Sequence, residues 1–104
     1  MYCLCGAVGY TGAPVLAASA AVRSGSGLVF LGVPKDIWPI VAVKCDSAMP
    51  SPLPSQQGKL ALAAEDAVRA QIDGCDAVLI GCGMGRSEES DALTRRLIDM
   101  DKPL

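Results

Sequence analysis

Three short apolar runs constrain the fold of this chain more than any other feature of its sequence. They cover residues 1–5 (MYCLC), 28–33 (LVFLGV) and 76–81 (DAVLIG), and glycine or proline ends or follows each of them. Apolar runs of this length, bounded by turn-forming residues, are typical of strands that are buried on both faces. The sequence therefore predicts three buried strands.

Three helical segments alternate with these runs, over residues 13–24, 59–74 and 87–100. The first is rich in alanine, the best helix former. Gly74 is suited to end the second, and Ser87 is a good N-cap for the third. The apolar residues expected on one helical face are Leu60, Ala64, Ala67, Val68 and Ile72 in the second segment, and Leu93, Leu97 and Met100 in the third.

The remaining segments carry weaker signals. In residues 34–44, Pro34 is suited to open a short helix and Pro39 to interrupt it after a few residues. Residues 46–58 contain three prolines and are expected to form a loop. Pro103 and Leu104 are expected to begin a fourth strand.

Strands and helices that alternate in this way predict an α/β fold with a parallel sheet and right-handed crossovers. A chain of 104 residues suffices for one modest core, so residues 1–104 are expected to form a single domain. A parallel sheet of three or four strands has an open edge, which natural proteins usually cover. We therefore expect a partial domain, the front part of a larger one.

Composition argues against several classes of function. The net charge is −2 and no run of Lys and Arg is interleaved with aromatic residues, so we expect no nucleic-acid partner. No stretch approaches the ~20 apolar residues of a membrane span, and the N-terminus lacks the basic start of a signal peptide. We expect a cytoplasmic protein whose five cysteines (Cys3, Cys5, Cys45, Cys75 and Cys82) are reduced.

Metal binding and cysteine catalysis are not expected either. The chain has no histidine, the commonest metal ligand and acid/base group. We expect alternation along the first strand to send Cys3 and Cys5 to opposite faces, which argues against a shared metal ion. Cys82 precedes a predicted helix, but no histidine is present to activate it as a nucleophile.

Two glycine clusters follow predicted strands, one at Gly6, Gly9 and Gly12 and the other at Gly81, Gly83 and Gly85. Neither matches the P-loop, and the second differs by one residue from the dinucleotide fingerprint G-x-G-x-x-G. Both nevertheless lie where parallel sheets bind ligands, and each precedes a helix whose first N–H groups are free to bind an anion. We predict a ligand site between the clusters, with tight turns as the alternative interpretation.

Four motifs occur in colinear order, GYTGAP (9–14), RSGSGLV (23–29), AMPSPLP (48–54) and GCGMGRS (81–87). Together they resemble the NAD(P)H-hydrate dehydratases. The resemblance implies a ribokinase-like, three-layer αβα fold, here truncated to a parallel sheet of about three to four strands with helices on both faces.

The resemblance also implies a lyase that repairs a damaged cofactor. Hydrated NADH or NADPH is dehydrated at the expense of ADP or ATP with Mg²⁺, by phosphorylation of the added hydroxyl and elimination of phosphate. By motif position, the residues expected to contact the hydrated dinucleotide are Ala13 and Gly85, with Thr11, Gly12, Gly83 and Arg86 as neighbours.

The sequence departs from the family pattern at three positions: Ala7 replaces a common Ser, Cys82 a usual Pro and Met84 a common Leu. The family's G-T-G-D motif, which supplies the anion hole and the catalytic Asp, would follow position 104. We therefore expect no catalytic residue within these residues, and an isolated chain that is inactive.

Two other functions are compatible with the same residues. One is a ribokinase-type kinase that acts on a small vitamin or sugar alcohol, and the other is a non-catalytic nucleotide-binding or assembly module. Members of the family are often oligomeric, and an exposed sheet edge adds a physical reason to expect a homo-oligomer.

Overall fold

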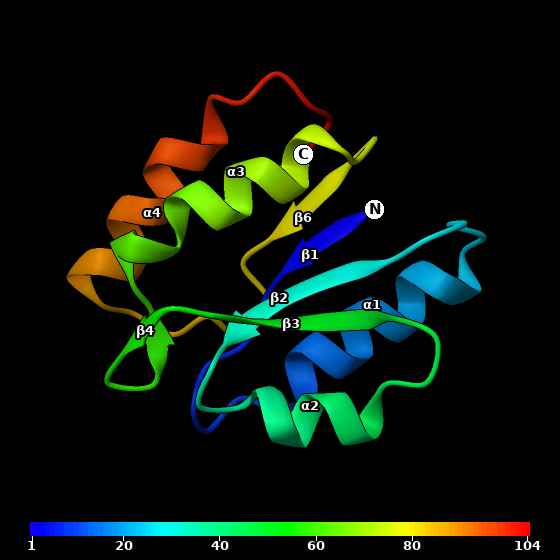
Figure 1. Cartoon of the computed structure of the whole chain (residues 1–104), viewed down its shortest axis with the longest axis horizontal. Coiled ribbons are helices and arrows are strands. Elements are labelled where there is room, and N and C mark those ends of the chain that lie inside the picture. Colours follow the sequence, from blue (N-terminus) through cyan, green and yellow to red (C-terminus); the bar gives the residue numbers. More distant parts are fainter.

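A four-stranded parallel sheet forms the centre of the protein in a computed structural model that describes residues 1–104 (Figure 1). The strands lie in the order β3-β2-β1-β6. Tyr2 of β1 pairs with Phe30 of β2 on one side and with Val78 of β6 on the other, so the N-terminal strand is internal. The predicted parallel sheet is confirmed. The strands are β1 (Tyr2–Leu4), β2 (Phe30–Pro34), β3 (Met49–Leu53) and β6 (Val78–Ile80).

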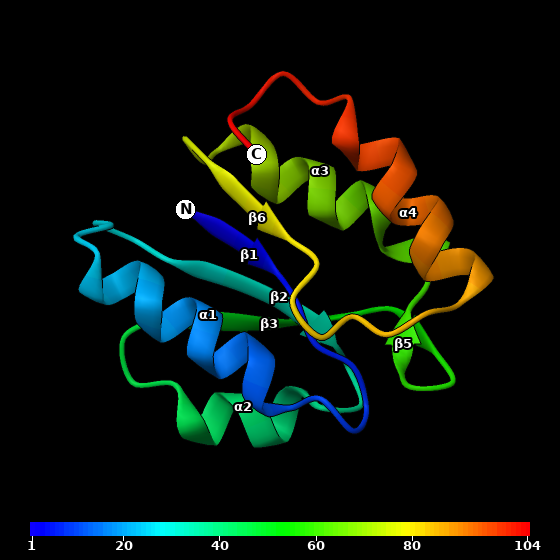
Figure 2. The same cartoon turned by 180° about the vertical axis from the view of Figure 1, so that it is seen from behind.

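Helices cover both faces of this sheet (Figures 1 and 2). Helices α1 (Gly12–Arg23) and α2 (Trp38–Lys44) lie on one face. The 3₁₀ helix η1 (Leu62–Ala64) and helices α3 (Glu65–Asp73) and α4 (Glu88–Ile98) lie on the other. The three-layer αβα arrangement is therefore confirmed. None of the helices combines the length and the apolar character needed to cross a bilayer.

Strand β1 supplies side chains to both layers of the core. Tyr2 and Leu4 belong to the cluster beneath α3 and α4, whereas Cys3 and Cys5 belong to the cluster beneath α1 and α2. The expectation that Cys3 and Cys5 lie on opposite faces was wrong, because residues two apart in a strand share a face. Both thiols are fully buried, as expected of core cysteines.

Residues 46–58, expected to form a loop, contain the edge strand β3. Its prolines, Pro50 and Pro52, alternate with residues that can donate a backbone N–H toward β2, and the N–H of Met49 donates to the carbonyl of Val29 at 2.9 Å. A proline is tolerated at the edge of a sheet where its missing N–H would face solvent. The loop prediction was wrong because Pro50 and Pro52 lie two residues apart in an edge strand. Both can therefore occupy positions whose N–H would face away from β2.

A short hairpin follows β3 and was also missed. Strands β4 (Ser55–Gln56) and β5 (Lys59–Leu60) pair antiparallel. The two residues between them, Gln57 and Gly58, have φ of 52° and 76°, as a tight two-residue hairpin turn requires.

The helix predicted over residues 59–74 is shorter, because its first two residues form β5 and the next turn is the 3₁₀ helix η1. Helix α3 begins at Glu65, and Gly74 occupies its C-cap as predicted. Leu60 is buried as part of β5, and Ala67 is exposed instead of facing the core.

The two prolines of residues 34–44 have roles opposite to those expected. Pro34 is the last residue of β2, and Pro39 lies in the first turn of α2 instead of interrupting it. The first turn of a helix has no intrahelical partner for an N–H, so proline is suited to that position. Helix α2 consequently begins later and continues to Lys44.

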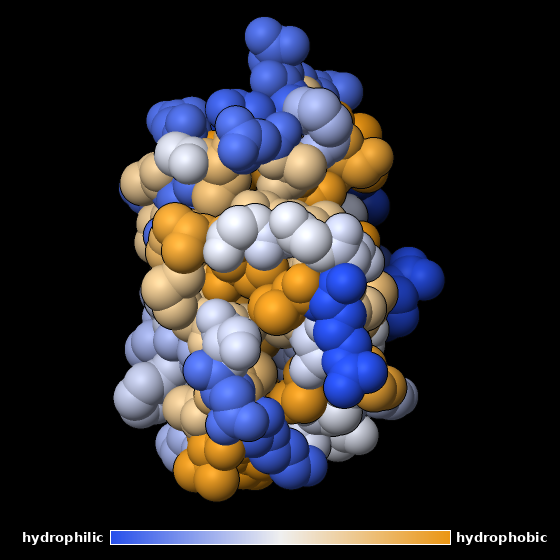
Figure 3. All heavy atoms as spheres, turned by 90° about the vertical axis from the view of Figure 1, so that its right-hand side faces the viewer, coloured by the Kyte–Doolittle hydropathy of each residue, from blue (hydrophilic) through white to orange (hydrophobic).

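The outer edge of β6 is partly covered near the C-terminus. The N–H of Val78 donates to the carbonyl of Pro103 at 2.9 Å, although no regular strand forms at Pro103 and Leu104. Figure 3 shows the adjacent face, where the strands begin, with apolar surface set among hydrophilic side chains. Leu28 and Gly27 lie at this end of the sheet and are exposed.

Gly32, in the middle of β2, generates a stability prediction. A Cβ at this position would lie 2.2 Å from Tyr2 Oη and 2.8 Å from Leu53 Cδ1, so Gly32→Ala overpacks the core. We expect a loss of about 1–3 kcal/mol in the free energy of unfolding, measured by urea denaturation. Gly27→Ala, where nothing lies within 4 Å, is the control. Adding Tyr2→Phe should restore part of the loss, and no difference between the two glycine variants would contradict the packing.

Candidate functional site

Three segments meet at the carboxyl end of the sheet (Figure 2). They are the first glycine loop (residues 6–11), the second glycine loop (residues 81–86) and the β4–β5 hairpin. The N–H of Gly6 donates to the carbonyl of Cys82 at 2.9 Å, and the N–H of Val8 donates to the carbonyl of Gly58 at 2.8 Å. The structure therefore brings together the two glycine clusters that the sequence singled out.

Gly83 packs closely against the end of the first loop and the start of α1. Its φ is 68°, and a Cβ there would lie 2.6 Å from the Cβ of Ala13 and 3.1 Å from the Cβ of Tyr10. Only glycine combines this backbone conformation with so close an approach. Of the residues predicted to contact a ligand, Gly83 and Ala13 are therefore in direct contact with each other.

Gly85 and the start of α1 lie on either side of this contact. Gly85 has a φ of 70°, and its α-carbon faces the aliphatic part of Lys59. Thr11 occupies the N-cap position of α1 but its hydroxyl makes no capping bond. Gly12, the first residue of α1, is exposed and has open space around it. The N-terminus of α1 thus presents small residues and an uncommitted hydroxyl at the loop junction.

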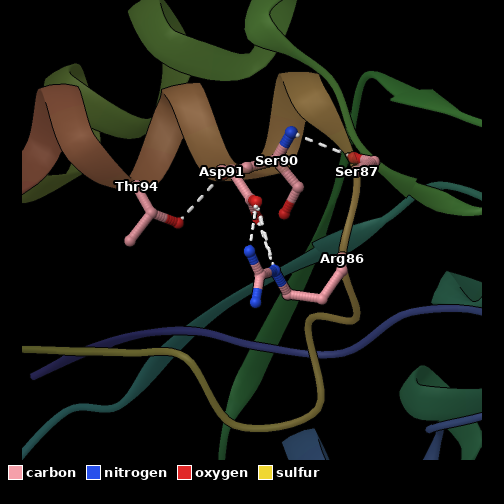
Figure 4. Close-up of polar contacts among 5 residues, drawn as sticks. All are labelled: Arg86, Ser87, Ser90, Asp91 and Thr94. Atoms are coloured by element: carbon pink, nitrogen blue, oxygen red, sulfur yellow. Dashed lines mark hydrogen bonds and ion pairs between the residues drawn. The ribbon is translucent and has the colours of Figure 1, made fainter.

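Arg86 is exposed and pairs with Asp91 of α4 (Figure 4). Its Nε and Nη2 donate to the Asp91 carboxylate at 2.9–3.2 Å, while Nη1 makes no hydrogen bond within the chain. Hydrogen bonding to this guanidinium lowers the pKa of Asp91 and raises the pKa of Arg86. The arginine is thereby held beside the N-terminus of α4 with one nitrogen still available.

The N-terminus of α4 is capped as the sequence predicts. Ser87 Oγ accepts a hydrogen bond from the N–H of Ser90 at 3.1 Å (Figure 4). Two acidic residues of this turn have partners: Glu89 accepts from the N–H of Leu62 at 3.1 Å, and Asp91 pairs with Arg86. These bonds join α4 to η1 and to the second glycine loop.

Sequence reasoning missed the contribution of the hairpin to the site. Gln56, Gln57 and Lys59 of the hairpin, together with the residues that open α4, line a polar hollow of about 350 Å³. The only sequence signal was the dipeptide Gln57–Gly58, a weak relative of the Asn-Gly and Asp-Gly turns. The residues of α4 and the loop before it that line this hollow are Arg86, Ser87, Glu88 and Glu89.

The arrangement has the chemistry of a binding site. The hairpin amides and the cations of Lys59 and Arg86 line the polar hollow and suit a polar, anionic ligand, while two carboxylates, Glu88 and Glu89, line it as well. No three His, Cys, Asp or Glu side chains lie close enough together to hold a metal ion.

The two tight glycines generate a paired prediction. Gly85→Ala adds strain at a positive φ but its closest neighbour is the flexible end of Lys59, so we expect a loss of about 1–2 kcal/mol. Gly83→Ala has nearly the same φ and also meets Ala13, so it should cost about 1 kcal/mol more. Urea denaturation of both variants measures the difference. Equal losses would contradict the close packing of Gly83 against Ala13.

The Arg86–Asp91 pair generates a titration prediction. The folded-state pKa of Asp91 lies below its ordinary value, so stabilisation by the pair is present at neutral pH and is lost as the pH falls through that pKa. In Arg86→Gln the pKa of Asp91 should rise, measured by NMR titration of the carboxyl carbon. Glu65, whose pKa is lowered by Arg96 and Arg69, is the internal control and should not change. An unchanged Asp91 would contradict the pairing.

Comparisons with known proteins agree with this architecture. A family model described as NAD(P)H-hydrate dehydratase matches residues 1–104. The chain is 39% identical over 102 residues to the bifunctional NAD(P)H-hydrate repair enzyme Nnr of Salinibacter ruber, an alignment that covers 95% of this chain and 19% of that protein. It is 38% identical over 95 residues to the ADP-dependent (S)-NAD(P)H-hydrate dehydratase of Cenarchaeum symbiosum, covering 88% of this chain and 32% of that protein.

A third relative, the ADP-dependent (S)-NAD(P)H-hydrate dehydratase of Xanthomonas campestris, is 34% identical over 89 residues, covering 85% of this chain and 30% of that protein. The chain thus spans between a fifth and a third of the length of these relatives. Because the family model matches the chain from its first residue to its last, the protein belongs to the NAD(P)H-hydrate dehydratase family.

Proposed function

We propose that this chain is part of an enzyme that repairs hydrated NADH or NADPH, and that its two glycine loops form one wall of the site for the hydrated dinucleotide. The observation that carries the proposal is the contact of Gly83 with Ala13, which joins the second glycine loop to the start of α1 at the carboxyl end of the sheet. Ligands bind at this end in open α/β sheets. The family assignment supplies the class of ligand.

The proposed contacts follow from what the loop residues expose. Ala13, Gly12 and Gly85 have small or no side chains, so the hydrated nicotinamide ring can approach the backbone closely. Thr11 adds a hydroxyl that makes no capping bond. Gly83 has a structural part in the proposal, because it holds the second loop against Ala13.

Positive charge beside the loops suits the pyrophosphate of a dinucleotide. Lys59 and the exposed guanidinium of Arg86 both line the polar hollow next to Gly85. Arg86 can bind a phosphate through Nη1 without releasing Asp91, because only Nε and Nη2 are used in that pair. Lys59 is a candidate that sequence reasoning did not identify.

The adenine nucleotide belongs to the proposal but is not assigned to residues of this chain. Two relatives are named as ADP-dependent dehydratases, which supports ADP or ATP as the co-substrate. When bound with Mg²⁺, it would supply the phosphoryl group that activates the added hydroxyl for elimination. The described residues offer no carboxylate cluster for that ion, and we place no catalytic residue among them.

The alternatives differ in how far they are supported. The compared relatives are hydrate-repair enzymes by name, which disfavours a kinase acting on a vitamin or sugar alcohol. A non-catalytic binding or assembly module stays a prediction, as does a homo-oligomer. The partly uncovered outer edge of β6 supports self-association, and sedimentation measures it.

Gly12→Leu tests the proposed wall without disturbing the fold. A Cβ at Gly12 would meet nothing within 4 Å and Gly12 has no positive φ, so we expect a leucine there to be tolerated and to extend toward the proposed ligand space. We expect unchanged stability and at least about tenfold weaker binding of hydrated NADPH, a loss of ~1.4 kcal/mol. NMR shifts of backbone amides during a titration with hydrated NADPH measure both affinity and location.

The matched control is Gly27→Leu, which has equally open surroundings at the other end of α1. It should bind like the unmodified chain, with shifts confined to residues 7–13, 56–59 and 82–86. Shifts elsewhere, or equal affinity in both leucine variants, would overturn the assignment of this wall. Plain NADPH in a parallel titration separates recognition of the hydrated ring from binding of any dinucleotide.

A further inference from the structure

Two cysteines meet where β1 and β6 end, and the proposed function does not use them. Cys5 directly follows β1 and is fully buried, whereas Cys82 lies in the second glycine loop and is exposed. Both are free thiols. An oxidant can reach an accessible thiol first. A protected thiol beside it can then react with the oxidised sulfur.

The hydrogen-bond ladder shows that these residues lie opposite each other. Along β1 and β6 the N–H of Tyr2, which pairs with Val78, donates to the carbonyl of Ala77. Continued at the same register, the N–H of Gly6 would donate to Gly81. It donates instead to Cys82, so the ladder shifts by one residue after β6 and brings Cys82 level with Cys5.

Gly81 makes this shift possible. Its φ of 126° is a conformation that residues with side chains rarely adopt, and it lies between the last regular pair and the shifted bond. An extra residue in one of two paired strands is a bulge, a feature that redirects a neighbouring side chain. Here it sets the position of Cys82 relative to Cys5.

Residues level with each other on neighbouring strands have a separation that suits a disulfide. Neighbouring strands lie about 4.8 Å apart, and a disulfide joins Cα atoms about 4.4–6.8 Å apart. Burial raises the pKa of the Cys5 thiol, and the adjacent Cys3 and Cys82 thiols raise it further, which is consistent with sulfur atoms in close proximity. Because Cys5 is a poor thiolate and is shielded from solvent, the exposed Cys82 is the first target of an oxidant.

We propose that Cys5 and Cys82 form a peroxide-sensitive pair that closes into an intramolecular disulfide and locks the two glycine loops together. Hydrogen peroxide oxidises the Cys82 thiol to a sulfenic acid and releases one water. The Cys5 sulfur then attacks the Cys82 sulfur, its proton joins the departing hydroxide as a second water, and the S–S bond forms. A dithiol such as dithiothreitol reduces the bond by exchange.

The other cysteines are placed less favourably. Cys3 lies in the same buried cluster as Cys5. It is two residues earlier in the chain, and therefore further from the second glycine loop. Cys75 is buried on the opposite face of the sheet, and Cys45 ends α2, away from both loops. Cys82 is the exposed cysteine of the chain, and it replaces the proline that the family resemblance leads one to expect.

The lock acts on the contact that builds the proposed wall. Cys82 directly precedes Gly83, so a covalent bond to Cys5 fixes the hydrogen bond from Gly6 and the approach of Gly83 to Ala13. A cross-link between distant parts of the chain also restricts the unfolded state. Oxidation is therefore expected to raise the melting temperature by about 5 °C or more, reversibly.

The experiment treats the full chain with hydrogen peroxide and maps its cysteines by mass spectrometry. We expect the loss of two hydrogen atoms from the monomer and a tryptic link between peptides 1–23 and 70–86. Each peptide contains a second cysteine, so fragmentation must place the link at Cys5 and Cys82. Dithiothreitol should restore both the mass and the melting temperature.

Cys82→Ser, at an exposed position, should abolish the link and the rise in melting temperature without loss of fold. Cys45→Ser is the matched control and should retain both. A sulfenic acid at Cys82 that dimedone traps while Cys5 stays reduced would overturn the proposal. A link between Cys82 residues of two molecules, or an intramolecular link that survives in Cys82→Ser, would do the same.

Discussion

The pairing of β1 with β6 is the interaction on which the rest of this structure depends. It joins the first residues of the chain to Val78–Ile80 and makes β1 an internal strand, bonded on its other side to β2. Cys3 and Leu4 are fully buried, one in each layer of the core. A shift of one residue would turn every side chain of β1 to the wrong face, so both helical layers specify this register.

The position of the candidate site follows from that pairing. Parallel neighbours end at the same edge, so the loops after β1 and β6 emerge side by side although they are far apart in sequence. Positive φ at Gly6 and Gly83 then allows the two backbones to bond and approach closely. The β4–β5 hairpin bonds to the first loop through Val8 and brings Lys59 to Gly85. The site is therefore a consequence of strand order, refined by glycine.

Much of the fold could be predicted from the sequence, because its signals are local. Apolar runs identified β1, β2 and β6, alanine content identified α1, and an N-cap serine with an apolar stripe identified α4. The failures are equally informative. Several prolines in a short segment predict a loop, unless the segment is an edge strand. Strand β3 lies at an edge, which the sequence by itself does not show. The Gln57–Gly58 turn carries a weak signal by itself, and it is supported by its bond to Val8.

By itself, the sequence determined the alternation of strands and helices, the glycine loops at strand ends and the family to which these motifs belong. It also indicated most of the residue types of the proposed wall. Only the tertiary structure decided that Gly83 approaches Ala13, that Arg86 pairs with Asp91, and that Cys82 lies level with Cys5. The physical reason is that periodicity and capping act over a few neighbouring residues, whereas these contacts depend on the order and register of strands that are distant in the chain.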